Sequence, residues 1–305
     1  MESCKFHKLS IGIIIFIFVL TGAPILSAAS YDRPPFAYMS TQQKTCKSVS
    51  GISPLLTRGK ILLFGEMHGT KEIPAFIADV ICMAVKKRVP VTLGLEIPSD
   101  EQMAIDRFLV SKGGEEAKAR LTKGAFWHRK FPDGSSYTDG RTSIAILQLI
   151  DQIRSMRASG AKVRIVAYDQ ESGSVAQKRD WLMAQNLGDA ARRESGNLFV
   201  VLTGDVHARL MRGTSWNKEF EPMGYLLTKS INSSHIVSFA VSHEGGEAWL
   251  CVELPPDMKQ TCKSLPLKPK TGVPPAWSVK MTAEPNSAYS GIFGVGRITS
   301  SLPVH

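Results

Sequence analysis

Several common catalytic signatures are missing from this 305-residue sequence. It contains no G-x-S-x-G nucleophile elbow, no Walker A phosphate loop, no H-E-x-x-H zinc helix and no G-x-G-x-x-G after the first predicted strand. No two cysteines are spaced as C-x-x-C, which argues against a cysteine-based zinc site. These absences exclude the most familiar serine-hydrolase, nucleotide-binding and zinc-protease templates.

Acidic residues are the scarcer charge. The chain has 27 Asp and Glu against 37 Lys and Arg, a formal net charge of +10 at pH 7. The basic residues are spread along the chain and are not interleaved with aromatic residues, so we do not expect nucleic acid as a partner. A basic surface attracts anionic partners such as envelope polymers, lipid head groups or haem propionates, and peripheral membrane contact is one consequence.

Long hydrophobic runs are also rare, and the one that stands out lies at the N-terminus. The run IGIIIFIFVL (11–20) follows Lys5 and Lys8 and precedes Ser27-Ala28-Ala29. This order is typical of a secretory signal peptide, here residues 1–29, and predicts a secreted or periplasmic protein. An uncleaved membrane anchor is the alternative, although the run is shorter than the ~20 residues that a spanning helix needs.

Export would allow the four cysteines after the signal segment to form disulfides. Cys82 lies in an apolar helical pattern and is expected to be a buried thiol. Any two of Cys46, Cys251 and Cys262 could pair: Cys251–Cys262 closes the shortest loop, and Cys46–Cys262 would tie distant parts of the chain. Spacing alone does not decide between these pairings.

Apolar runs alternate with helical periodicities between residues 60 and 205. The continuous apolar runs are expected of strands buried on both faces, and they cover 60–64, 91–97, 162–169 and 197–205. Helical periodicity covers 73–87, 101–111, 142–159 and 174–194. This alternation predicts an α/β fold with a mainly parallel sheet flanked by helices.

The pattern changes after residue 220, where shorter apolar runs follow one another. Residues 224–229, 235–243 and 247–254 are expected to form additional C-terminal antiparallel strands. The α/β domain is therefore predicted to cover 30–254. Residues 255–305 hold eight of the 17 prolines and are predicted to be a Pro-rich, partly disordered extension.

Polar residues stand at the carboxyl end of every predicted parallel strand. Glu66 and His68 follow the first strand, Glu96 ends the second, Asp169 ends the third, and the fourth runs into Asp205-Val206-His207. Ligands of open parallel sheets bind beyond these ends. The sequence therefore predicts one site that combines two imidazoles with several carboxylates.

Two kinds of chemistry suit such a set of side chains. A divalent metal such as Zn, Mn or Co could be bound, with His68, His207 and Glu66 as candidate ligands. Alternatively, His68 could act as a general base whose tautomer is set by a carboxylate. The glycine that precedes each histidine motif would let the chain turn sharply and a ligand approach closely.

The segment 112–140 is expected to be a long polar loop with aromatic content, which favours a functional lid or wall over a plain connector. Phe126 and Trp127 could form an apolar wall over the site. Arg141 could clamp a carboxylate or phosphate of a substrate, and Asp169 is a further candidate for substrate binding.

The stretches FGEMHGTKEIP, LGLEIP and TGDVHA, together with their order and spacing, resemble the superfamily of erythromycin esterases, ChaN haem-uptake proteins and TIKI/TraB proteases. The resemblance runs from about Lys60 to Arg209. It implies that Glu66, His68, Glu96 and His207 line the site.

The three branches imply different activities. In the esterases the matching His is thought to activate water while the acids orient it; in the proteases the motifs resemble metal ligands. In the haem-uptake branch the cleft binds haem, and Tyr137, Tyr168 or His128 would be the candidate axial ligands here. We expect a hydrolase that acts on an ester or amide bond of a small-molecule or peptide substrate, with haem binding as the alternative.

Overall fold

The computed structural model of the protein describes residues 46–170, 176–252, 261–270, 274–284 and 287–305. The predicted signal peptide, residues 1–29, lies outside these described residues. Within the described ranges, every helix is too short or too polar to cross a bilayer.

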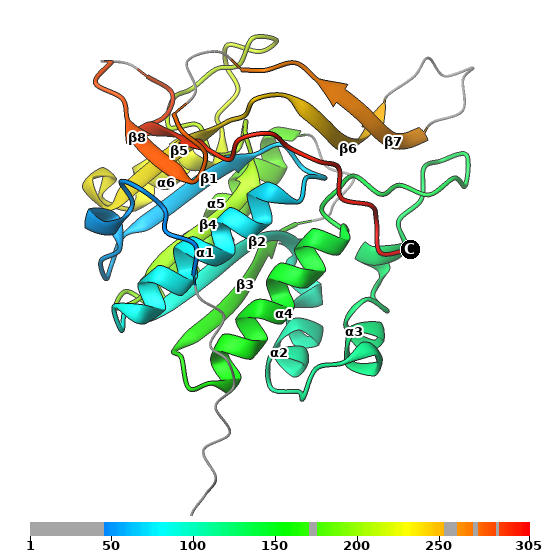
Figure 1. Cartoon of the computed structure of the whole chain (residues 1–305). Coiled ribbons are helices and arrows are strands. Elements are labelled where there is room, and N and C mark those ends of the chain that lie inside the picture. Colours follow the sequence, from blue (N-terminus) through cyan, green and yellow to red (C-terminus); the bar gives the residue numbers. More distant parts are fainter. Residues whose placement is uncertain (1–45, 171–175, 253–260, 271–273, 285–286) are drawn as a thin grey trace, which may run out of the picture. The chain divides into compact units, whose positions relative to one another are not determined.

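The central feature is a seven-stranded sheet with the strand order β3-β2-β4-β1-β5-β9-β8 (Figure 1). Its strands are β1 (Ile61–Glu66), β2 (Val91–Pro98), β3 (Val163–Asp169), β4 (Leu198–Gly204), β5 (Ile236–Ser242), β8 (Ser278–Met281) and β9 (Gly291–Gly294). Neighbouring strands are parallel from β3 to β9, and β8 is antiparallel to β9. The expected α/β fold with a mainly parallel sheet is confirmed.

Helices cover both faces of the sheet. Since successive strand residues point to opposite sides, each strand packs against both helix layers. Leu62 and Phe64 pack with α1 (Glu72–Lys86), α2 (Gln102–Leu109) and α4 (Ile144–Ala158). Ile61 and Leu63 pack with α5 (Ala176–Arg193) and α6 (Met223–Ser230) on the other face. Figure 1 shows α1 and α4 in front of the sheet and α5 behind it.

The order of the strands places three carboxyl ends side by side. The chain runs from β1 to β2 to β3 with its helices on one face, and then returns to β4 and β5 with its helices on the other. Right-handed crossovers require this change of face, because the chain first moves across the sheet toward β3 and then moves back toward β5. Strand β4 therefore lies between β1 and β2, so the carboxyl ends of these three strands are neighbours at the edge where open parallel sheets bind ligands.

The structure corrects two expectations for the segment after residue 220. Residues 224–229, predicted as a strand, belong to helix α6, which buries Met223 and Leu227 one turn apart. Strand β5 pairs parallel to β1, whereas we expected an antiparallel strand. The short apolar run at 224–229 fits both periods, and the packing of α6 against α5 decides for the helix.

The predicted extension 255–305 also differs from the expectation in its described parts. Strands β7 (Thr261–Leu267), β8 and β9 lie within it, and β9 occupies a position between β5 and β8. Further along, Ser301 N donates to Gly69 O (2.8 Å) and Ile144 N donates to Leu302 O (2.9 Å). These bonds make the segment part of the α/β domain.

Two disulfides are present among the described residues. Cys46 bonds to Cys82 on α1, which corrects the prediction that Cys82 is a free thiol. Cys251 bonds to Cys262, one of the pairings that the sequence left open. The latter two residues oppose each other directly across β6 (Gly246–Val252) and β7, which form a separate antiparallel sheet.

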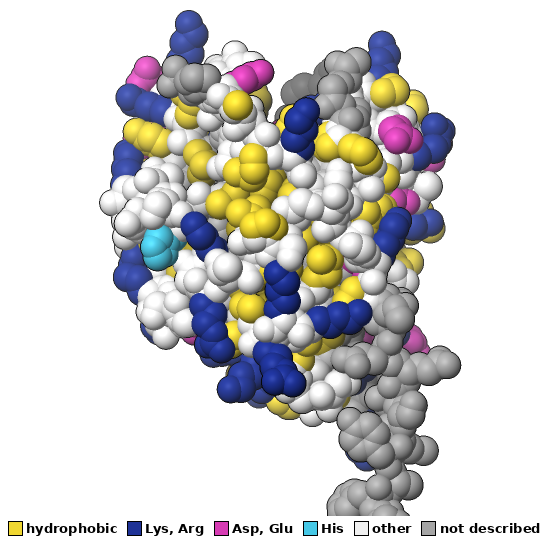
Figure 2. Space-filling model, turned by 60° about the vertical axis from the view of Figure 1, so that its left-hand side comes forward, with side chains coloured by type: hydrophobic (Ala, Val, Ile, Leu, Met, Phe, Trp, Pro, Cys, Tyr) yellow, Lys and Arg dark blue, Asp and Glu magenta, His cyan; other side chains and the backbone are white. Residues whose placement is uncertain are grey.

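Basic side chains are dispersed over the face that Figure 2 shows. Lys and Arg stand among hydrophobic and uncharged side chains there, and Asp and Glu are sparse. This distribution agrees with the even spread of positive charge along the sequence.

Candidate active site

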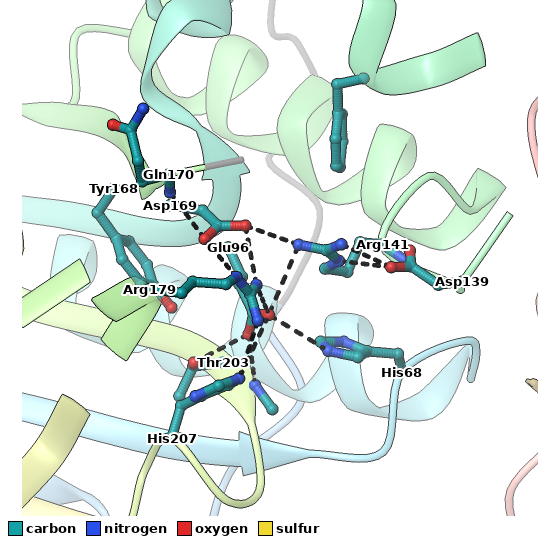
Figure 3. Close-up of polar contacts among 12 residues, drawn as sticks. His68, Glu96, Asp139, Arg141, Tyr168, Asp169, Gln170, Arg179, Thr203 and His207 are labelled. Atoms are coloured by element: carbon teal, nitrogen blue, oxygen red, sulfur yellow. Dashed lines mark hydrogen bonds and ion pairs between the residues drawn. The ribbon is translucent and has the colours of Figure 1, made fainter. Parts of the chain in front are cut away.

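Glu96, near the carboxyl end of β2, is the centre of a buried polar cluster (Figure 3). Its Oε2 accepts hydrogen bonds from Thr203 Oγ1 (3.0 Å) and Gly204 N (2.7 Å). Its Oε1 accepts a hydrogen bond from Arg179 Nη2 (2.6 Å). With both oxygens engaged and a side chain only 4% exposed, Glu96 is a fixed anchor.

Two arginines lie over this anchor, and the sequence had pointed to only one of them. Arg179, in the first turn of α5, donates to Asp169 through Nε and Nη2, each at 2.9 Å. Arg141 donates to Asp169 (2.7 Å) and, through Nε and Nη2, to Asp139 (2.9 and 2.6 Å). Because Asp169 is fully buried, it acts on the arginines and presents no surface to a substrate.

The positive neighbours keep the central carboxyl ionised. Burial by itself raises the pKa of Glu96, since a charge is costly in a low-dielectric interior. The pKa nevertheless lies well below its usual range, because the positive charges of Arg179 and His68 favour the anion more strongly than burial opposes it. Glu96 is therefore a permanent negative charge at physiological pH.

His68 follows β1 and lies between two carboxylates. Its Nδ1 is 2.8 Å from Glu66 Oε1, and its Nε2 is 3.7 Å from Glu96 Oε1. Burial lowers the pKa of His68, but Glu66 and Glu96 outweigh burial and raise the pKa to about 10. At neutral pH the ring consequently carries a proton on both nitrogens.

His207, after β4, has a different pair of neighbours. Its Nδ1 is 2.8 Å from Asp180 Oδ2, and its Nε2 is 3.2 Å from Arg179 Nη1. Since a guanidinium can only donate, the contact at Nε2 requires a lone pair there and assigns the proton to Nδ1. Asp180 is fully buried and also accepts from Met223 N (2.7 Å), which fixes its carboxylate in place.

Gly204 explains how the two imidazoles come so close. A Cβ at this position would lie 3.3 Å from His68 Nε2 and 3.2 Å from His207 Cδ2. Both rings therefore border the space directly over Gly204, and a larger residue would force them apart. The two histidine motifs thus aim their rings at one point, as the sequence predicted.

Asp205, the acid beside the second motif's glycine, does not join this cluster. Its backbone N donates to Glu66 O (3.0 Å), and its Oδ1 lies 2.9 Å from where a Cβ on Gly65 would stand. Burial raises the pKa of the Asp205 carboxyl. Gly65, the glycine of the first motif, is therefore needed to make room for Asp205, so its role is one of packing.

The aromatic segment before Arg141 differs from the predicted wall. Trp127 is 2% exposed and packs in the hydrophobic core, so it does not present a face to a ligand. The Phe126 ring is nearer the cluster, with Arg141 Cζ 5.7 Å from its centroid. His128 is exposed and stacks on His305 at a centroid distance of 4.4 Å.

The arrangement of donors does not fit a divalent metal. Of the predicted ligands, His68 and Glu66 bond to each other, and His207 bonds to Asp180. Both Nε2 atoms face Glu96, which already binds the guanidinium of Arg179. This positive charge would repel a metal cation between the two rings. Among the described residues, no three His, Cys, Asp or Glu side chains are grouped in a way that could hold a metal ion.

Comparisons with known proteins bear on the fold. No family model matches the chain, and no curated protein is similar enough in sequence to match it. An erythromycin esterase mutant in its open conformation matches with a TM-score of 0.54 and 12% identity, covering 83% of this chain and 93% of that one. The chain has the erythromycin esterase-like fold.

Two further solved structures share this fold. A Bacillus cereus protein matches with a TM-score of 0.53 and 12% identity, over 83% of this chain and 92% of that one. A succinoglycan biosynthesis protein matches with a TM-score of 0.55 and 10% identity, over 82% and 91%. At such low identity the likeness shows the fold alone, and it confirms the fold that the sequence resemblance implied.

The haem-binding alternative named Tyr137, Tyr168 and His128 as candidate axial ligands. The match to ChaN of Campylobacter jejuni has a TM-score of 0.34 over 63% of this chain, which is too low to carry an argument. Tyr168 is fully buried and donates to Leu202 O (3.1 Å), and Tyr137 packs under Arg129 at 4.7 Å. Tyr168 is therefore closed off from a ligand, whereas Tyr137 is half-buried and His128 is exposed.

Proposed function

We propose that this chain is an exported hydrolase that cleaves an ester or amide bond by acid–base chemistry at His68 and His207. The observation that carries the proposal is the difference between the two Nε2 atoms. Both lie near Glu96 Oε1, at 3.7 Å for His68 and 3.8 Å for His207, but His207 Nε2 has a nearer neighbour in the guanidinium of Arg179, at 3.2 Å. Environments that favour opposite protonation states identify an acid and a base.

This difference assigns His68 as the general acid and His207 as the general base. The assignment reverses the sequence-based hypothesis, in which His68 activates water. The reason is that a ring with a pKa of about 10 holds its proton at neutral pH and so is poised to donate it. Asp180, which the sequence did not point to, then orients the base.

In the proposed reaction, a water molecule replaces Arg179 at His207 Nε2. The Nε2 atom takes a proton as the water oxygen bonds to the carbonyl carbon, and Asp180 stabilises the imidazolium that forms. The freed Arg179 Nη1 donates to the carbonyl oxygen while negative charge develops there. When the C–O or C–N bond breaks, His68 gives its Nε2 proton to the leaving atom, and solvent returns a proton from His207 to His68.

The two glutamates act through other groups in this scheme. Glu66 holds Nδ1 of His68 and thereby fixes the ring. Glu96 lies 3.7 Å and 3.8 Å from the two Nε2 atoms and favours the protonated form of each in turn. The substrate class remains that of the sequence hypothesis, a small molecule or peptide with an ester or amide bond.

Export is part of the proposal. It rests on the N-terminal pattern of charged, apolar and small residues, and the two disulfides agree with an oxidising compartment.

Paired esters with the same acyl group and different leaving groups test the assignment. A 4-nitrophenyl ester needs little help from an acid, whereas an ethyl ester needs a proton on its leaving oxygen. We expect His68→Gln to lower kcat/KM by roughly 100-fold or more for ethyl acetate and butyrate but by less than about tenfold for their 4-nitrophenyl counterparts. His207→Gln should lower both by similar factors, because both substrates need an activated water.

The matched control is His235→Gln, which changes an exposed histidine whose ring contacts the backbone of Gly59. It should leave both rates unchanged. A wild-type protein that hydrolyses no member of an ester and amide panel would overturn the proposed function. Equal losses for both ester types in His68→Gln would overturn the acid assignment.

A further inference from the structure

The two-stranded sheet β6–β7 reaches both loops that carry the cluster, and Trp249 makes the contacts. Its backbone N donates to Gly69 O (2.9 Å), directly after His68. Its indole Nε1 donates to Thr138 O (2.8 Å) and Thr138 Oγ1 (3.2 Å), directly before Asp139. One residue therefore joins the His68 loop to the segment that leads into the arginine-binding carboxylate.

Two glycines let these segments touch backbone to backbone. Gly69 has a φ of +76°, and a Cβ there would fall 2.1 Å from Trp249 O. Gly140 has a φ of +85°, and a Cβ there would fall 2.4 Å from Gly69 N and 2.9 Å from the carbonyl carbon of His68. Only glycine tolerates both the conformation and the contact at these two positions. Because the backbones then touch with no side chain between them, a displacement of β6 moves the His68 backbone directly.

Asp139 links the same contact to the arginines. It accepts two hydrogen bonds from the Arg141 guanidinium, a third from the Arg141 backbone N (3.3 Å), and one from Arg129 Nη2 (2.8 Å). Arg141 in turn bonds to the fully buried Asp169. The position of Trp249 is therefore coupled to His68 on one side and, through Asp139, to the guanidinium of Arg141 on the other.

The Cys251–Cys262 disulfide supports this hairpin. Strands β6 and β7 form a two-stranded sheet, which Gly246 of β6 links to Ile298 by a single bridge, and a two-stranded sheet is marginally stable by itself. The disulfide joins directly opposed residues, two positions beyond Trp249 in β6. A covalent bond at this point keeps the strand that carries Trp249 in register with its partner.

We infer that Trp249 is a positioning residue for the site, held in place by the Cys251–Cys262 disulfide. It sets the distance between His68 and the Asp139–Arg141 pair, and loss of the disulfide relaxes that distance. The kinetic consequence rests on the proposed function, whereas the displacement of His68 does not.

Trp249→Phe is the first test, because it removes the indole N–H and keeps the aromatic ring and the backbone bond to Gly69. We expect kcat to fall about tenfold, the effect of one lost hydrogen bond, with KM changed by less than about twofold. The imidazole ¹⁵N signals of His68 should shift. Trp277→Phe is the matched control, since that indole donates to Asp79 (2.8 Å) on α1. It should leave both readouts unchanged.

The two disulfides provide a second matched pair. Replacing Cys251 and Cys262 with Ser should shift the His68 signals and lower kcat. Replacing Cys46 and Cys82 with Ser should lower the melting temperature and leave the His68 signals in place.

The signals of His68 decide the inference even if no substrate is found. Unshifted His68 signals in both Trp249→Phe and the Cys251/Cys262 double variant would overturn it. Equal shifts in the two disulfide variants would also overturn it, because they would indicate a general loss of stability. An inactive wild type with shifted signals in the Trp249 variant would count against the proposed hydrolase and support the positioning role.

Discussion

Glu66 is the anion nearest to His68, and its removal tests the charge on that ring most directly. Glu66→Gln replaces the carboxylate with a neutral amide of nearly the same shape, so an acceptor for Nδ1–H, now at 2.8 Å, is retained. Glu96, 3.7 Å from Nε2, stays in place. The substitution therefore removes one of the two charges that raise the pKa of His68 and leaves the geometry nearly intact.

The expected size of the effect follows from the contact. An opposite charge at this range shifts a pKa by about 1–3 units, so the pKa of His68 should fall from about 10 to roughly 7–9. In the wild type the folded pKa exceeds the unfolded value of 6.5. Protonation of His68 therefore stabilises the fold fully below that value, and this stabilisation is lost as pH rises through the folded pKa. At a pH below both the unfolded and the folded pKa, each unit by which the substitution lowers the folded pKa lowers the free energy of unfolding by about 1.4 kcal/mol.

Two measurements check this. Histidine ¹⁵N spectra recorded from about pH 5 to pH 11 give the pKa of His68 in both proteins. Urea unfolding at about pH 6 and above about pH 10 gives the stabilities, and the gap between the two proteins should narrow at the higher pH. A wild-type His68 that titrates near 6.5, or the same pKa in both proteins, would refute the reasoning.

Two further substitutions test the position of the two rings and the orientation of His207. Gly204→Ala should lower kcat/KM by roughly 10–100-fold with little change in melting temperature, since its Cβ would stand 3.2–3.3 Å from His207 and His68 and move both rings. Unchanged ester kinetics in this variant would place the reaction elsewhere. Asp180→Asn should lower kcat by about 10²–10⁴-fold, because an amide no longer enforces the proton on Nδ1 of His207. A loss of less than about tenfold, measured with the 4-nitrophenyl ester, would argue against His207 as the base.

Local sequence patterns were sufficient to predict the main strands and the meeting of the strand-end residues. The run at 60–64 became β1 at Ile61–Glu66, and the run at 197–205 became β4 at Leu198–Gly204. Because parallel strands end at one edge, Glu66, His68, Glu96 and His207 could be expected near one another, and the structure brings them into one cluster.

Arg179 and Asp180 were missed because they look like the polar face of an amphipathic helix. The strand order decides otherwise, since α5 packs on the same sheet and its first turn starts at the carboxyl edge. Every crossover helix after a parallel strand begins at that edge. The first-turn residues of such a helix were therefore candidates that periodicity alone did not single out.

The errors in the second half of the chain have another cause. The prolines after residue 255 suggested an extension, but β9 gains its place through pairing with β5, about fifty residues earlier in the chain. Likewise, the apolar pattern around Cys82 predicted burial and said nothing about Cys46, 36 positions away. Long-range pairings of this kind leave no local signal.

The bonds of residues 299–302 have a consequence for the order in which the molecule assembles. Lys71 N donates to Thr299 O (3.0 Å), and Ser301 N donates to Gly69 O (2.8 Å), so segments more than 200 positions apart fix the turn after His68. Contacts of such large sequence separation form slowly, because a long loop must close first. The sheet and its core can therefore form before the turn that carries His68 is fixed, which makes completion of the proposed site a late property of this fold.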